Sequence, residues 1–305
     1  MHPKRVADNG QNRISVVRGN RVVPLLPSVE REGRHESRKE QPWRGVLLER
    51  HTVSAIEIPE HEHRELCFHL QIAGEEPMEW WSGGRRGVEK TASGSMILLP
   101  AGTRDRLRWQ GGSERLIVSV DPEPLNRVAE EAGVSTPEFE PQWSLQDRAV
   151  EQVVFEMGRE AREGWPLGRL YADLTAAGFV SLLLRRHAVD PIDLGHIQGG
   201  LPMLQLRRAM EFVSANLDRD LRLEEIANEV NLSPFHFARE FRSRTGQTPY
   251  QYLLDQRMER AKDLLNHSWT VQEVAAMTGF RSPVNFVRAF RQRVGVSPGV
   301  WRKGA

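Results

Sequence analysis

Residues 223–252 read LEEIANEVNLSPFHFAREFRSRTGQTPYQY, and residues 271–301 read VQEVAAMTGFRSPVNFVRAFRQRVGVSPGVW. The second stretch repeats the first at an offset of 48 positions, which becomes 49 after one extra residue, Arg281. Matched pairs include Phe237 with Phe286, Arg239 with Arg288, Phe241 with Phe290, and Arg242 with Arg291. A duplicated helical unit with arginines at matching positions is suited to a protein that binds a repeating polymer. Duplex DNA is such a polymer, because it presents a new major-groove face every ~10.5 base pairs.

Apolar residues at helical spacing and explicit start signals predict the helices of this region. The first begins at Pro202, and the others are expected over 223–230, 233–245, 249–266, 271–278, 282–294 and 298–303. Thr248 with Gln251 and Thr270 with Glu273 have the spacing of capping boxes. Arg222 stands at the position that matches Thr270 and cannot accept an amide hydrogen bond, so we expect that helix start to fray.

Each copy places a short helix, a turn and a longer helix in succession, which is the helix-turn-helix arrangement. Arginine can bond guanine at two atoms, asparagine can pair with adenine, and apolar side chains can contact the thymine methyl group. The alternative is that these arginines are ordinary solvated residues, but their recurrence in register favours base reading. The candidate DNA-binding residues are Phe235, His236, Arg239, Arg242, Val284, Asn285, Arg288 and Arg291.

The helix expected over 249–266 connects the two copies. At 1.5 Å per residue it would be ~27 Å long, so two reading helices projecting from its ends would lie about one DNA turn, ~34 Å, apart. One chain should then cover two successive major grooves over ~20 base pairs, with some bending of the DNA.

The segments SPFHFAREFRSRTGQTPYQYL and GFRSPVNFVRAFRQRVGVSPGVWR resemble the DNA-binding domain of AraC/XylS-type transcriptional regulators. The resemblance covers about the last 100 residues, and the GxSPxxWR ending is specific to that family. It implies an all-α domain over 203–305 with two helix-turn-helix motifs. It also implies that double-stranded promoter DNA is the partner and that the protein usually acts as an activator that contacts RNA polymerase.

The rest of the chain predicts a multidomain α+β protein. Residues 1–42 are polar, and we interpret them as a mostly disordered tail with one short strand at 21–25. Residues 43–140 contain short β-rich runs punctuated by glycine and proline, typical of a small antiparallel barrel or jelly roll. Residues 141–188 predict a helical hairpin that either forms a homodimer contact or packs on the barrel, and 189–202 form a linker.

The segments IPEHEHRELCFHLQIAG and GSMILLPAGTRDRLRW resemble, less specifically, the cupin-like sensory domain of the same family. In cupin enzymes such positions hold a metal through two histidines, a glutamate and a third histidine. Here Cys67 stands in place of the glutamate and Asp105 in place of the last histidine. A metal held by His61, His63, Cys67 and Asp105 is one interpretation. The other, which we adopt as the prediction, has no metal and no cofactor.

A small-molecule effector of unknown identity is the expected ligand of this region. Alternation along the strand from Leu66 to Ile72 would place Cys67, His69 and Gln71 on one face. Aromatic rings can supply apolar walls, and histidines or arginines can anchor a small acid or polyol. The candidate ligand-binding residues are His61, His63, Cys67, His69, Trp80 and Arg104.

Composition narrows the class of protein. Cys67 is the only cysteine, which excludes a disulfide framework. No signal-peptide core or ~20-residue apolar span is present, so we expect a cytoplasmic protein without a membrane partner. Residues 205–305 hold 16 Lys and Arg against 11 Asp and Glu, whereas the remainder holds 26 against 30. The basic end is a modest indication of nucleic-acid binding.

Three functions are compatible with these patterns. The first is a ligand-responsive, DNA-binding transcriptional regulator that is not an enzyme. The second is a metal-dependent cupin enzyme with an appended DNA-binding domain, and it rests on His61 and His63 alone. The third is a DNA-architectural protein without a sensor, which would leave the front domain without a role.

Overall fold

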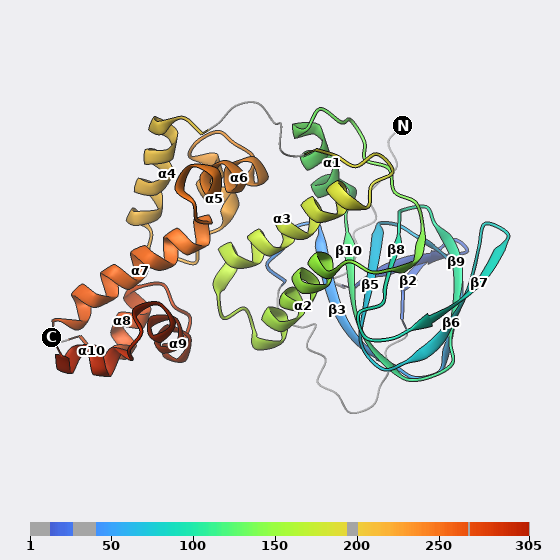
Figure 1. Ribbon diagram of the computed structural model, residues 1–305, viewed down its shortest axis with the longest axis horizontal. Helices are drawn as coiled ribbons and strands as arrows, with labels where there is room; N and C mark the ends of the chain where they lie inside the picture. The colour runs from blue at the N-terminus through green and yellow to red at the C-terminus, as the bar shows by residue number, and fades with distance from the viewer. Residues whose placement is uncertain (1–12, 27–40, 194–200, 268, 305) are drawn as a thin grey trace. The chain divides into compact units, whose positions relative to one another are not determined.

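The computed structural model describes residues 13–26, 41–193, 201–267 and 269–304 (Figure 1). The chain forms two compact units. The first comprises residues up to 127, 135–158 and 186–191, and the second comprises 128–134, 159–185 and 192 onward. Residues 194–200, which are half of the predicted linker, and residues 1–12 and 27–40 of the predicted tail lie outside the described residues. The domain boundaries given above remain predictions.

The first unit is built from antiparallel strands. They are β1 (Ser15–Arg18), β2 (Arg21–Pro24), β3 (Val46–Val53), β4 (Ile56–His63), β5 (Leu66–Ala73), β6 (Glu76–Ser82), β7 (Arg85–Thr91), β8 (Met96–Leu99), β9 (Arg104–Trp109), β10 (Ser113–Val120) and β11 (Gln142–Leu145). One sheet has the order β2-β1-β4-β9-β6-β7, and the other has the order β11-β8-β5-β10-β3. The predicted β-rich region is confirmed. The described strands form two separate sheets rather than a closed barrel, because no hydrogen-bonded pair joins the two orders.

An apolar cluster draws on both sheets. Ile58, Met78 and Trp109 come from the first sheet, and Cys67 and Ile117 come from the second. The alternation of side chains along each strand accounts for this arrangement, since every second residue faces the same side. In β9, for example, the residues at 105, 107 and 109 are buried and those between them face outward.

Residues 13–26 contain two strands where the sequence predicted one. The predicted strand at 21–25 is present as β2, but β1 was not predicted, and it joins the first sheet by pairing with both β2 and β4. The physical reason is burial: Ile14, Val16, Leu25 and Leu26 are each no more than 4% exposed. The burial of these apolar side chains therefore accounts for the order of both short strands.

Helices make up the second unit and cross into the first. They are α1 (Pro122–Glu131), α2 (Arg148–Glu163), α3 (Gly168–Arg186), α4 (Met203–Ala215), α5 (Leu223–Asn228), α6 (Pro234–Thr245), α7 (Pro249–Leu265), α8 (Val271–Met277), α9 (Pro283–Val294) and α10 (Pro298–Gly304). Those after residue 202 match the predicted ranges closely. Among the described residues, no helix has both the length and the apolar character that crossing a membrane requires.

The predicted start signals of the C-terminal helices are confirmed. Ser233 and Ser282 are the N-caps of α6 and α9, and each hydroxyl accepts an amide hydrogen bond from the residue three positions later. Thr248 and Thr270 open α7 and α8 with complete capping boxes. The two halves of the repeat therefore begin their longer helices with the same local chemistry.

The start of α5 shows how tertiary structure replaces a missing cap. The Arg222 side chain accepts no amide hydrogen bond, as expected, but the Glu225 carboxylate accepts one from the Arg222 amide at 2.8 Å. Asp173 of α3 accepts the Leu223 amide at 3.0 Å. The fraying that the sequence predicts is therefore opposed by a carboxylate that lies 50 positions earlier in the chain.

Asp173 gives the stability of this unit a pH dependence. Burial raises the pKa of its carboxyl group to about 6, although the hydrogen bond from the Leu223 amide acts in the opposite direction. A carboxyl whose pKa is raised by folding contributes most stability when protonated, so the free energy of unfolding should fall as pH rises from about 4 to about 6. Urea denaturation across this range should show a weaker fall for Asp173→Asn. An unchanged slope in this variant would contradict the assignment.

Candidate functional site

The two helix-turn-helix units lie at opposite ends of α7. The α5–α6 unit lies with α4 at one end, and the α8–α9 unit lies with α10 at the other (Figure 1). Buried α7 side chains, including Leu254, Met258, Ala261 and Leu265, join a single apolar cluster with both units. The connecting helix has 17 residues, which corresponds to a length of about 26 Å. It thus holds the two longer helices as parts of one packed body.

Paired phenylalanines fix the rotation of the longer helices. Phe237 and Phe241 of α6 are fully buried, and so are Phe286 and Phe290 of α9. The ring centroids within each pair lie 5.4 and 5.6 Å apart. Because these rings define the buried face, the residues about half a turn away face outward, as the sequence analysis expected.

Both turns contain a left-handed residue at the same place in the repeat. Asn231 follows α5 with φ of 54°, and Gly279 follows α8 with φ of 72°. A side chain at 279 would meet the Leu217 carbonyl oxygen and the Arg257 guanidinium. Arg257 is itself buried, and it donates to the carbonyl oxygens of Leu217 and Arg219. The second turn therefore needs glycine for both its backbone conformation and its space.

On the outward side of α6, the carboxylate of Glu240 contacts other residues of the same helix. Glu240 accepts from Arg239 at 3.0 Å and lies 4.0 Å from the His236 imidazole. Phe235 is half-buried, whereas Arg242 is exposed. Sequence reasoning did not anticipate the part of Glu240, although its position directly after Arg239 was a visible indication. The Glu240 carboxylate therefore holds Arg239 through a hydrogen bond and lies near His236.

The outward side of α9 meets the connection between α2 and α3, within the same compact unit. Asn285 donates from Nδ2 to the Pro166 carbonyl oxygen at 3.4 Å, and an Arg288 guanidinium nitrogen lies 3.5 Å from a Glu163 carboxylate oxygen. The Arg288 side chain remains 64% exposed. Val284 and Arg291 are also exposed. No local pattern in the sequence indicated that residues 163–166 would reach this helix.

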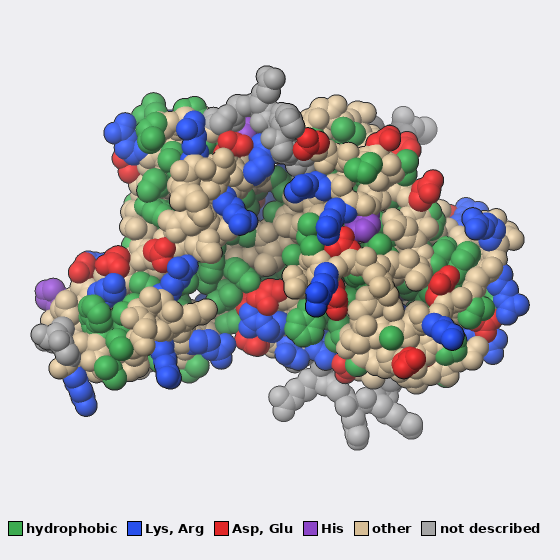
Figure 2. Space-filling view, in the orientation of Figure 1, with side chains coloured by type: hydrophobic (Ala, Val, Ile, Leu, Met, Phe, Trp, Pro, Cys, Tyr) green, Lys and Arg blue, Asp and Glu red, His purple; other side chains and the backbone are tan. Residues whose placement is uncertain are grey.

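Basic side chains do not form a continuous patch on the face of the C-terminal helices shown in Figure 2, where acidic and apolar side chains lie among them. This agrees with the modest excess of 16 basic over 11 acidic side chains in residues 205–305. An arginine bonded to bases at defined atoms needs correct placement more than a strong overall field.

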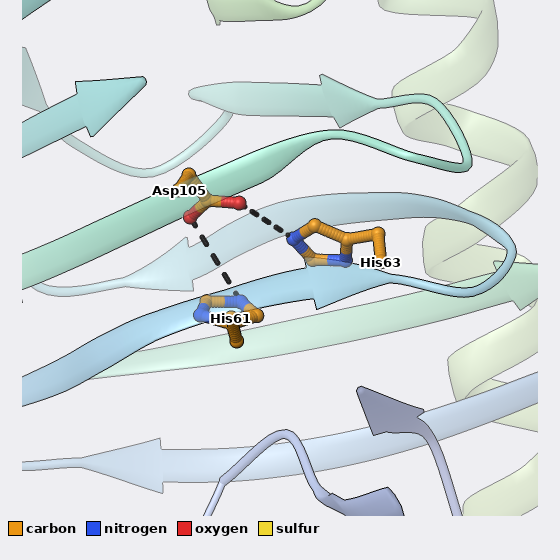
Figure 3. Close-up of side chains that lie close together, drawn as sticks. All are labelled: His61, His63 and Asp105. Carbon is orange, nitrogen blue, oxygen red and sulfur yellow. Dashed lines mark hydrogen bonds and ion pairs between the residues drawn. The ribbon is translucent and has the colours of Figure 1, made fainter. Parts of the chain in front are cut away.

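Two histidines and an aspartate of the candidate ligand-binding region lie together inside the first unit (Figure 3). His63 Nε2 and Asp105 Oδ1 are 2.9 Å apart, and His61 Nε2 and Asp105 Oδ2 are 3.9 Å apart. All three residues are at most 2% exposed. Burial lowers the pKa of His61, although the Asp105 carboxylate acts in the opposite direction. His61 is therefore held as neutral imidazole near pH 7.

Cys67 and His69 lie on β5, in the opposite sheet. The Cys67 thiol and His69 Nε2 are 3.3 Å apart, and both residues are fully buried. Burial raises the pKa of the Cys67 thiol and lowers the pKa of His69, so both are neutral near pH 7. Cys67 is thus paired with His69 and is separate from the group formed by His61, His63 and Asp105, contrary to the four-residue ligand set considered from the sequence.

Trp80 and Arg104 occupy different surroundings. The Trp80 ring is buried and stacks on Trp143 with centroids 4.6 Å apart. Arg104 faces outward, with its side chain 74% exposed, and donates to Glu62 at 2.7 Å. The position of Trp80 suits an apolar wall. That of Arg104 does not suit a pocket anchor, because alternation along β9 turns it away from Asp105.

Comparison with protein families matches residues 226–304 to a helix-turn-helix domain. The regulatory protein PocR of Salmonella typhimurium is 35% identical over 32% of this chain and 33% of its own length. The MmsAB operon regulatory protein of Pseudomonas aeruginosa is 31% identical over 43% of this chain and 40% of its own.

Longer matches occur at lower identity. The transcriptional activator RhaR of Cronobacter sakazakii is 29% identical over 54% of this chain and 58% of its own length. Among solved structures, the DNA-binding domain of AdpA in complex with a target DNA is 36% identical over 33% of this chain and 91% of that domain, with a TM-score of 0.32. The chain spans between about a third and three fifths of the curated relatives it matches.

Proposed function

We propose that the protein is an AraC-type, sequence-specific DNA-binding transcriptional regulator that acts as an activator, because residues 226–304 match a helix-turn-helix domain. The observation that carries the proposal is the packing of two helix-turn-helix units onto the two ends of α7, each with its paired phenylalanines buried. Such a body presents α6 and α9 to successive major grooves on one side of a duplex. The partner is double-stranded promoter DNA.

The front unit is proposed to serve as a cupin-like sensory domain for a small-molecule effector. Its support is an interior between two sheets that combines apolar walls such as Trp80 and Trp109 with buried polar groups such as His69. Effector binding, homodimer formation, contact with RNA polymerase and a cytoplasmic location are parts of the same proposal. It includes no catalytic step, in keeping with the relatives named above, which are regulators.

Selection of bound duplexes from a random pool, followed by footprinting with the full-length protein, tests this function. We expect a site of ~20 base pairs with two protected segments about one helical turn apart. The two segments should differ in sequence, because the repeat matches Phe235 and His236 of α6 with the different residues Val284 and Asn285 of α9. Salt should weaken binding through counterion release. Recovery of no preferred sequence would contradict the proposal.

The connection between α2 and α3 is expected to reduce DNA binding by α9. The side-chain donors that Asn285 and Arg288 would use on bases are bonded to Pro166 and Glu163. DNA therefore has to replace those contacts. Because an exposed ion pair contributes about 0.3–1 kcal/mol, Glu163→Gln should raise affinity about two- to five-fold. Electrophoretic mobility shifts measure this change. Glu151→Gln is the control, since it removes the same charge from the other end of α2, and an equal effect there would contradict the contact.

A further inference from the structure

We propose that His61, His63 and Asp105 form a binding site for one divalent transition-metal ion inside the front unit. The site draws on two strands of one sheet. Both histidines belong to β4 and the aspartate to β9, and His61 and Asp105 are direct cross-strand partners (Figure 3). The inference does not depend on DNA binding, because every residue involved lies in the first compact unit.

The spacing of the donor atoms suits a small ion. The three donor atoms lie within 4.8 Å of one another, with 2.9 and 3.9 Å between the Asp105 oxygens and the two histidine nitrogens. Nitrogen and oxygen ligands about 2.0–2.2 Å from a tetrahedral ion lie about 3.3–3.6 Å apart. Each observed separation between Asp105 and a histidine is within about half an ångström of that range. The three donor atoms are up to 4.8 Å apart, which is wider than that range, so the side chains would have to rotate toward one another to complete the coordination.

Two buried polar atoms at this place have no hydrogen-bond partner among the described residues. They are His61 Nε2 and Asp105 Oδ2, and they face each other. The side chains that carry them are 0% exposed. Leaving a buried donor or acceptor unpaired costs about 1–3 kcal/mol, and more for a charged group. A bound cation would satisfy both atoms at once.

The surroundings of His61 prepare it to act as a ligand. Its other ring nitrogen, Nδ1, lies 3.0 Å from the Pro59 carbonyl oxygen, so Nδ1 carries the proton and donates it there. This leaves the Nε2 lone pair directed at Asp105. Metal-binding histidines are commonly oriented by such a bond to a backbone carbonyl. A break in the strand register between Ile58 and His61 places His61 on the buried side together with His63.

The chemistry of the ligands narrows the choice of ion. Two imidazoles and one carboxylate suit Zn²⁺, Fe²⁺, Co²⁺ or Ni²⁺ better than Mg²⁺ or Ca²⁺, which prefer oxygen ligands alone. Metal binding needs the Nε2 lone pair of His63, so the neutral ring would carry its proton on Nδ1 rather than between Nε2 and Asp105. Three protein ligands leave one coordination position open for water or a small oxygen ligand.

Cys67 does not take part in this site. Its thiol lies on β5 in the other sheet and is paired with His69. This separation predicts a spectroscopic difference, since Co²⁺ bound to nitrogen and oxygen shows weak visible bands without the strong near-ultraviolet band of thiolate ligation. Cys67→Ser is therefore the matched control variant.

The test uses full-length protein that has been dialysed against a chelator and then titrated with Zn²⁺ or Co²⁺. We expect one equivalent to bind, with a rise in Tm and no thiolate band. His61→Gln and Asp105→Asn should each weaken Zn²⁺ binding at least about ten-fold, the scale for losing a ligating or supporting group, whereas Cys67→Ser should leave it unchanged. Circular dichroism of the metal-free variants checks that both remain folded.

Other outcomes would overturn the proposal. They are the absence of stoichiometric binding by the folded wild-type protein, or binding that survives in both His61→Gln and Asp105→Asn. A thiolate band that disappears in Cys67→Ser would move the ion to the opposite sheet. DNA selection can succeed or fail without any effect on these measurements, so the two proposals stand or fall separately.

Discussion

Replacement of Gly279 with alanine is expected to lower the free energy of unfolding of the C-terminal helices by about 2–5 kcal/mol. The left-handed backbone at φ of 72° accounts for about 1–2 kcal/mol of this loss. The new methyl group would collide with the Leu217 carbonyl oxygen and the Arg257 guanidinium, and such overpacking costs about 1–3 kcal/mol more. The backbone oxygen cannot move aside without disturbing the end of α4. Urea denaturation of the full-length protein measures the change.

Gly295→Ala provides the matched control. Gly295 has φ of 89°, so it carries the same backbone requirement, but no atom lies within 4 Å of the position of an added Cβ. This variant should lose only the contribution of the left-handed backbone. Equal destabilisation by both substitutions would show that space around Gly279 is unimportant.

A large loss of DNA sequence preference is expected from Arg239→Ala combined with Arg288→Ala. Each arginine is proposed to read one half of the DNA site, and a good contact contributes about 1–3 kcal/mol of discrimination. Each single variant should therefore lose about five- to 150-fold in preference for the correct base in its own half, and the double variant should lose preference in both. Competition between the selected site and single-base variants measures this loss.

Arg244→Ala controls for the loss of charge. Arg244 is an exposed arginine on α6, five residues after Arg239 and so on a different side of the helix. Its removal should weaken binding to all sequences alike and reduce the dependence on salt. If Arg239→Ala and Arg288→Ala behaved in the same way, α6 and α9 would not be the reading helices.

Most of the C-terminal helices could be predicted from the sequence, because their determinants are local. The hydroxyls of Ser233, Thr248, Thr270 and Ser282 cap amides three positions away, and the buried phenylalanines follow helical spacing. The match of residues 226–304 to a helix-turn-helix domain agrees with this prediction. Interactions within one helical turn need no knowledge of the rest of the chain.

The front unit was less predictable. Alternating patterns indicated strands, but they do not state which strands pair, so a closed barrel was expected where two sheets form. Strand β1 was not predicted, because a strand of four residues is too short to show a clear alternating pattern. It is stabilised by burial against strands that are distant in the sequence. Alternation placed Cys67 and His69 on one face of their strand, but it could not show that Asp105, on a distant strand, would lie beside the two other histidines instead.

The sequence by itself determined the repeat, the helix starts, the buried faces of α6 and α9, and thereby the kind of partner that the C-terminal helices suit. Only the tertiary structure decided which distant groups meet: Asp173 with the start of α5, Glu163 with Arg288, and Asp105 with His61. The reason is physical. Helical periodicity and capping depend on neighbours within about four positions, whereas a contact between residues 42 to 125 positions apart exists only after the chain has packed.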